Sequence, residues 1–139
     1  MKGEQESIII KTISRLLIPF IQFFGLYVIM HGHTSPGGGF QGGVILGASF
    51  ILLGIAYGYK TIAGRFSLKT LTIFTSLGVF IYAAIGVVCL LLGANFLDYG
   101  ILPINFEPRG MGMLGIEIGV GITVMAVMVS IYEDLLNFK

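Results

Sequence analysis

Four long apolar segments constrain the fold of this chain more than any other feature. They cover residues 13–30, 40–59, 71–92 and 111–132. A helix needs roughly 20 such residues to cross the hydrocarbon core of a bilayer. The segments are continuously apolar, whereas membrane strands alternate, and only 11% of the chain is charged. We therefore predict an all-α integral membrane protein with four transmembrane helices, forming one domain over residues 1–139.

The basic residues divide unequally between the two sides of the predicted membrane domain. One side would carry Lys2, Lys11, Arg15, Lys60, Arg65, Lys69 and Lys139. The other side would carry only Arg109. Because cytoplasmic loops are enriched in Lys and Arg, we predict that the N- and C-termini face the cytoplasm. The first and third connections would then lie at the outer face.

The third connection, residues 93–110, is more apolar than a loop in open water. Pro103 and Pro108 interrupt any helix there. We expect this loop to lie on the membrane surface or against another subunit.

The first connection contains the string HGHTSPGGGFQGG, residues 31–43. Gly37, Gly39 and Gly42 match a GxGxxG pattern, but the pattern follows a membrane helix instead of a strand. A dinucleotide site needs a βαβ unit, and a P-loop needs a GK[ST] ending that this string lacks. The sequence therefore argues against a nucleotide site, and nothing in it resembles a basic patch for nucleic acid.

Two interpretations of this glycine-rich connection remain open. In the first, Pro36 ends a helix, the glycines allow a tight reversal, and Gly43 and Gly47 let another backbone approach closely, a device that Gly54 and Gly58 repeat. In the second, non-helical backbone lines a polar path. The candidate packing and turn motif consists of Pro36, Gly37, Gly38, Gly39, Phe40, Gly42, Gly43 and Gly47. The excess of glycine indicates close contact with something outside the chain.

The polar residues of the same connection are candidates for an ion path. Gln41 would be one of the side chains lining the second kind of path. His31 and His33 are two residues apart and have no acid or cysteine nearby in sequence, so no metal site is expected. Such histidines are interfacial groups or members of a proton relay. Cys89 lies in an apolar segment and is expected to be inert.

Glu117 is the only acidic residue within a predicted span. A charge at this depth is costly and by default marks a proton or ion route. The alternative is that it reaches toward water at the outer surface. Gly121 leaves room beside the carboxylate, while Gly115 and Gly119 would seat another helix on the opposite face. One acid is too few for a complete pathway, so we expect the chain to work inside a larger assembly.

Three further residues carry expectations about helix ends. Pro19 is expected in the first turns of its span, where a missing N–H costs little. Glu133 and Asp134 follow the last span and lie at the negative end of its dipole, so we expect a solvated helix end or, alternatively, a basic partner there.

With these residues considered, the sequence resembles a known family. HGHTSPGGGFQGG is similar to the signature of the MnhB domain, the B-type small subunit of multisubunit Mrp or Mnh cation/proton antiporters. The string EIGVGITV, residues 117–124, resembles the last helix of that family.

This resemblance implies a non-catalytic, multi-pass subunit of the cell membrane, without a cofactor, in a sodium/proton antiporter. Its partners would be large antiporter-like subunits. Related subunits occur in archaeal membrane-bound hydrogenase-type complexes, so hydrogenase-type partners are also implied. Two alternatives stay open: a homo-oligomeric channel with a ring of Glu117 side chains, and a purely structural spacer.

Overall fold

The computed structural model describes residues 2–34 and 36–137, with the side chains of residues 2–6 and 59 left out. Its elements are α1 (Lys2–Met30), α2 (Gly39–Tyr57), the short α3 (Tyr59–Ala63), α4 (Leu68–Leu91), the 3-10 helix η1 (Tyr99–Ile101) and α5 (Pro108–Asn137). Four of these helices are long and apolar enough to cross a membrane, and the described residues contain no strand. The prediction of four transmembrane helices is confirmed.

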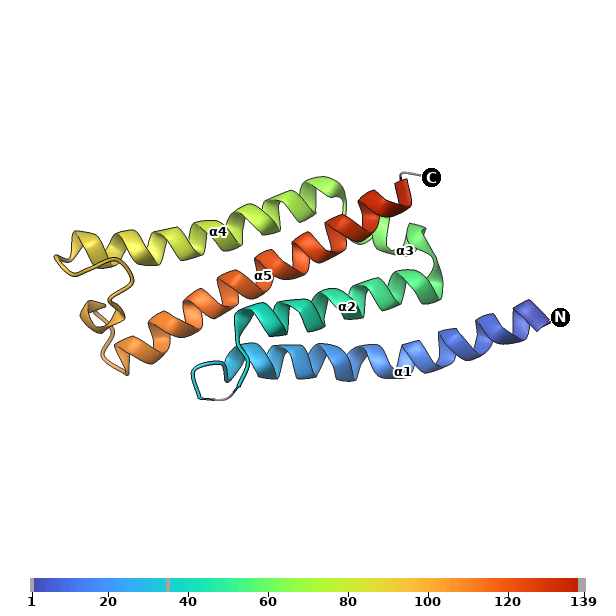
Figure 1. Cartoon of the computed structure of the whole chain (residues 1–139), viewed down its shortest axis with the longest axis horizontal. Coiled ribbons are helices and arrows are strands. Elements are labelled where there is room, and N and C mark those ends of the chain that lie inside the picture. The colour runs from blue at the N-terminus through green and yellow to red at the C-terminus, as the bar shows by residue number, and fades with distance from the viewer. Residues whose placement is uncertain (1, 35, 138–139) are drawn as a thin grey trace.

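The four long helices form a row in the order α1, α2, α5, α4 (Figure 1). Helix α5, last in the chain, lies between α2 and α4. The short α3 and the two described ends of the chain lie at one end of the row. The glycine-rich connection and the long loop before α5 lie at the other end. Lys139 lies outside the described residues, as does the side chain of Lys2.

Glycines allow α5 to approach both of its neighbours at backbone distance. On the α2 side, a Cβ atom added to Gly43 would lie 2.7 Å from the carbonyl oxygen of Gly121. On the α4 side, a Cβ atom added to Gly119 would lie 2.9 Å from the carbonyl oxygen of Gly78. Helices approach this closely in membranes only through small residues. Both faces of α5 are therefore occupied by helices of the same chain.

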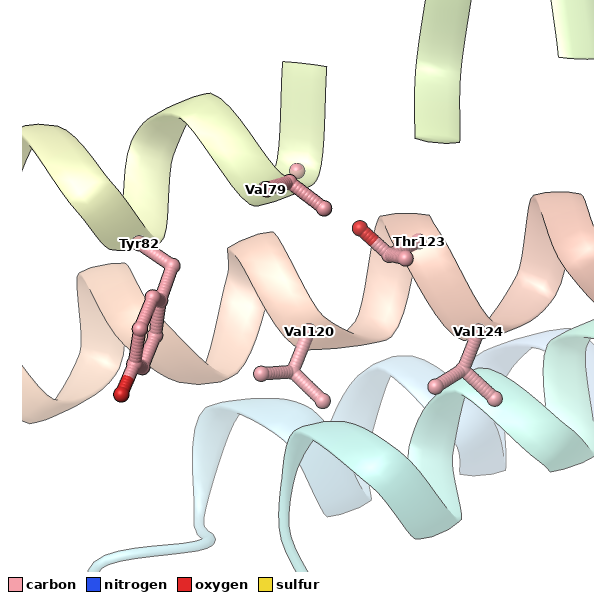
Figure 2. Close-up of a pocket in the computed structure, with 6 residues that line it drawn as sticks. Val79, Tyr82, Val120, Thr123 and Val124 are labelled. Atoms are coloured by element: carbon pink, nitrogen blue, oxygen red, sulfur yellow. The ribbon is translucent and has the colours of Figure 1, made fainter. Parts of the chain in front are cut away.

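The α4–α5 contact leaves a shallow groove along one surface of the row. Figure 2 shows Val79 and Tyr82 of α4 opposite Val120, Thr123 and Val124 of α5. The Thr123 hydroxyl donates a hydrogen bond to the Thr75 carbonyl oxygen at 3.3 Å. The groove therefore offers mainly carbon atoms, as a surface against lipid or another apolar helix would.

The main core lies near the end of the row that carries α3. It consists of Ile62, Leu71, Ala126 and Val129, against which Phe50, Phe66, Phe74 and Tyr132 pack. Phe66 makes edge-to-face contacts with Phe50 and Phe74, at ring-centroid distances of 4.9 and 6.5 Å. The segment between α2 and α4 is thus anchored by aromatic packing.

Two expectations from the sequence were wrong, one about the position of Pro19 and one about packing at Gly58. Pro19 lies deep inside α1, because the helix begins at Lys2, well before the apolar segment. Its missing N–H leaves the Arg15 carbonyl without its usual helical partner. Gly58 does not pack against a helix: it has no atom within 4 Å of an added Cβ, and it ends α2 with a φ of 92°.

The long loop before α5 folds back onto the helices of its own chain. Phe96 lies over Gly86 and makes an edge contact with Tyr82, and Tyr99 covers Gly112. Burial, followed by the neighbouring Tyr82 and Cys89, raises the pKa of Tyr99, so its phenol stays neutral at physiological pH. Phe106, by contrast, is 77% exposed. The helices of the same chain therefore bury only some of the aromatic side chains of this loop.

The Gly78 contact generates the first prediction. The substitution Gly78→Val would drive a side chain into Thr123 and the Gly119 carbonyl. We expect it to lower the free energy of unfolding by about 1–3 kcal/mol, the usual cost of overpacking. The measurement is the thermal unfolding midpoint of the purified protein in mild detergent. Ala83→Val, at an exposed position of the same helix, is the control and should change little; equal effects would contradict the contact.

Candidate functional site

Glu117 of α5 lies against the glycine-rich connection between α1 and α2. A Cβ atom added to Gly32 would fall 2.6 Å from Oε2 of Glu117, and one added to Gly38 would fall 3.5 Å from Oε1. A Cβ atom added to Gly39 would lie 2.8 Å from the Cα atom of Glu117. Three glycines therefore leave the space that the carboxylate and its backbone occupy.

The Glu117 carboxylate is only partly satisfied. Its Oε2 atom is buried and has no hydrogen-bond partner within the described part of the chain. A buried polar group without a partner costs free energy unless it is neutralised or gains a ligand. The group is therefore suited to bind a proton, a cation or water, or to pair with a group from another protein.

The structure brings one of the two histidines close to Glu117. His33 lies near enough for its charge to act on the Glu117 carboxylate. His31 instead stacks on Tyr27, with ring centroids 4.3 Å apart, and its Nδ1 atom lies 3.2 Å from the Tyr27 carbonyl oxygen. The two histidines, although two residues apart, thus have different surroundings.

Gln41 lies beside Gly37, on the α1–α2 surface. Its Oε1 atom is 2.6 Å from a Cβ atom added to Gly37, a residue with a φ of 119°. Gln41, Pro36 and the 64% exposed Phe40 line a cleft of about 390 Å³ on the α1–α2 surface. Glu117 does not line this cleft, so the structure separates Gln41 from the acid.

The remaining glycines of the motif contact this chain's own helices. Gly42 packs on Ile29 and on the Gly25 carbonyl of α1, and Gly47 packs on Met128 of α5. These contacts account for the excess of glycine without any partner outside the chain.

A second cleft opens beside Glu117 at the same end of the row. It has a volume of about 450 Å³ and is lined by His33, Glu107, Arg109 and Met113, together with Gly100, Pro108 and Gly110. Met113 lies one helical turn before Glu117, and His33 is the histidine near its carboxylate. The cleft and Glu117 therefore share two neighbours, Met113 on α5 and His33 in the turn.

Glu133 corrects the expectation of a solvated helix end. Its side chain is only 1% exposed, and its Oε1 atom has no hydrogen-bond partner within the described residues. Asp134, the next residue, is exposed. Glu133 is buried because it lies on the same face of α5 as Ala126 and Val129, which belong to the core. That spacing was visible in the sequence.

Sequence reasoning missed three residues of the site, Gly32, Glu107 and Arg109, and Gly32 is the one in contact with Glu117. Its position between His31 and His33 was the available signal, but nothing local indicated contact with a residue 85 positions later. The structure describes no group of three or more His, Cys, Asp or Glu side chains able to hold a metal ion among residues 2–34 and 36–137.

Comparison with known proteins agrees with this geometry. The antiporter subunits mnhB2 of Staphylococcus aureus strains Newman, JH1 and USA300, each named as a proposed subunit, are 26% identical to this chain over 136 residues. The alignment covers 95% of this chain and 96% of each relative. A family model described as a domain related to the MnhB subunit of Na+/H+ antiporter matches residues 9–130. Because this match spans nearly the whole of the four-helix row, the chain belongs to the MnhB family.

Proposed function

We propose that this chain is a non-catalytic integral subunit of a multisubunit sodium/proton antiporter in the plasma membrane. The chain contributes to assembly, and Glu117 supplies one polar group to an ion or water path. Its termini face the cytoplasm, which puts Glu117 and the glycine-rich connection at the outer side. Its partners are other integral subunits of the module, among them large antiporter-like subunits.

The single observation that carries this proposal is the family match over residues 9–130. The structure supports it by what the spans contain. The described spanning segments of α1, α2 and α4 hold no acidic residue, and α5 holds Glu117 within its apolar stretch and Glu133 and Asp134 near its C-terminal end. An ion route across a membrane needs a chain of such groups. Another subunit supplies the rest.

The role of Glu117 rests on its unsatisfied oxygen and on the adjacent cleft. A carboxylate with a buried, unpaired oxygen is able to accept a proton or hold a cation. The cleft lined by His33, Glu107 and Arg109 supplies polar access from the outer side. The glycines leave no side chain between the turn and the acid, and His33 belongs both to the lining of this cleft and to the surroundings of Glu117.

Co-purification tests the assembly part of this proposal. A tagged chain, extracted from its native membrane in mild detergent, should bring large antiporter-like subunits with it, as identified by mass spectrometry. Hydrogenase-type subunits among them would identify a redox-driven host complex. A chain recovered only as a ring of identical copies would overturn the proposal in favour of a homo-oligomeric channel.

Glu117→Gln tests the transport part. We expect sodium/proton exchange in everted membrane vesicles to fall about tenfold or more, equivalent to ~1.4 kcal/mol of the barrier, while subunit assembly stays normal. The loss follows because the amide has nearly the same shape but neither ionises nor binds a cation strongly. Asp134→Asn, at an exposed acid on the same helix, is the control. Full exchange in the Glu117→Gln variant would contradict a transport role for Glu117 and favour the alternative that the chain is a purely structural spacer.

Gly32→Ala tests whether the turn must stay clear of side chains. The added methyl group would overlap the Glu117 carboxylate and displace it. We expect a loss of exchange similar to that of Glu117→Gln, with the complex still assembled. Gly115→Ala, where an added Cβ meets only the flexible end of the Ile85 side chain, is the matched control and should keep its activity. If both variants exchange normally, the tight packing around the acid has no part in transport.

A further inference from the structure

A pocket at the opposite end of the row from Glu117 contains two arginines that have no acidic partner among the described residues. Arg15 of α1 and Arg65, which follows α3, line a cleft of about 270 Å³. The other residues that line it are Ile18, Pro19, Leu53, Tyr57 and Thr61. Three helices thus bring two guanidinium groups from distant parts of the sequence to one opening.

The charge of this pocket is not balanced within the described part of the chain. No carboxylate there lies within ion-pair distance of Arg15 or Arg65. The hydroxyl groups at the rim are already used by the backbone: Tyr57 donates to the Lys11 carbonyl oxygen at 3.3 Å, and Thr61 donates to the Tyr57 carbonyl oxygen at 3.2 Å. The pocket therefore has two positive groups available for an anion.

The shape of the arginine side chain narrows the kind of anion. A guanidinium presents paired donors that match the oxygens of a phosphate, and two of them can hold one phosphate from both sides. Lysines accompany the pocket: Lys60 belongs to α3, Lys69 is the second residue of α4, and the Lys11 carbonyl accepts the hydrogen bond from Tyr57 of the pocket rim. The orientation proposed above puts this end of the row at the cytoplasmic side, where basic pockets between membrane helices are suited to lipid headgroups.

The floor of the pocket favours a lipid over a free anion. Ile18, Pro19 and Leu53 offer carbon atoms below the arginines. Acyl chains gain from such a surface, whereas inorganic phosphate gains nothing from it.

We propose that Arg15 and Arg65 form a binding site for the phosphodiester headgroup of an anionic glycerophospholipid. The site is separate from the ion path and holds the lipid in the leaflet that faces the basic end of the row. The bound lipid links α1 to the segment after α3, two parts of the chain that lie on either side of α2.

The test measures phosphatidylglycerol bound to the purified complex by native mass spectrometry in a mild detergent. We expect the wild-type protein to bind phosphatidylglycerol and not to bind phosphatidylcholine. The double variant Arg15→Gln/Arg65→Gln should bind phosphatidylglycerol about thirtyfold more weakly. Arg15→Lys/Arg65→Lys should lose less, because it keeps the charge but not the paired donors. If the lysine double variant keeps binding that the glutamine double variant loses, the loss does not come from misfolding.

The matched control is Lys11→Gln/Lys69→Gln, which removes the same charge from the same end without changing the pocket lining. It should keep near wild-type binding. An equal loss in this control would show only a general attraction to anionic lipid and would overturn the site. Competition by inorganic phosphate alone would identify a free-anion site instead. Loss of a neighbouring subunit with unchanged lipid would show that a protein carboxylate fills the pocket, which also overturns the proposal.

Discussion

The approach of α5 to its two neighbours at backbone distance is the constraint on which the rest of the structure depends. Lipid tails are as apolar as leucine side chains, so helices inside a membrane gain little from hydrophobicity and associate by close packing. Gly43 and Gly121 on one side, and Gly78 and Gly119 on the other, provide that packing. Through these contacts the last helix of the chain holds together helices that precede it in sequence.

The same contacts determine where the polar groups lie. Because Gly39 rests on the backbone of Glu117, the turn before α2 is held against the acid, and Gly32 and Gly38 come to surround its carboxylate. The packing and polar-path interpretations of the glycine-rich connection are therefore compatible. The glycines that bring α2 and α5 together belong to the same stretch that leaves space around Glu117.

Much of the fold could be predicted from the sequence, because the requirement to satisfy the backbone in a bilayer leaves few choices. The four helices follow from hydropathy alone. Gly121 on one face of the last span, and Gly115 and Gly119 on the other, indicated that neighbours could approach it from both sides. What the sequence could not show was which helices occupy them. The start of α1 was misjudged because residues 2–7 are mostly polar or charged yet helical. The site was only half predicted: Glu117 and His33 were identified, but Gly32, Glu107 and Arg109 join them through contacts between distant segments.

The arrangement of the helices as a row has a consequence for the order of folding and assembly. By the usual scaling with mass, a compact monomer of this size exposes roughly 7,000 Å², whereas this chain exposes 8982 Å². The difference, about 2,000 Å², is comparable to what one partner contributes to a permanent protein interface. In a bilayer this surface is covered by lipid before any protein arrives. The row can therefore form first through its own glycine contacts, and later association exchanges lipid for protein. The fit of shapes, more than the removal of apolar surface from water, then decides which neighbour is accepted.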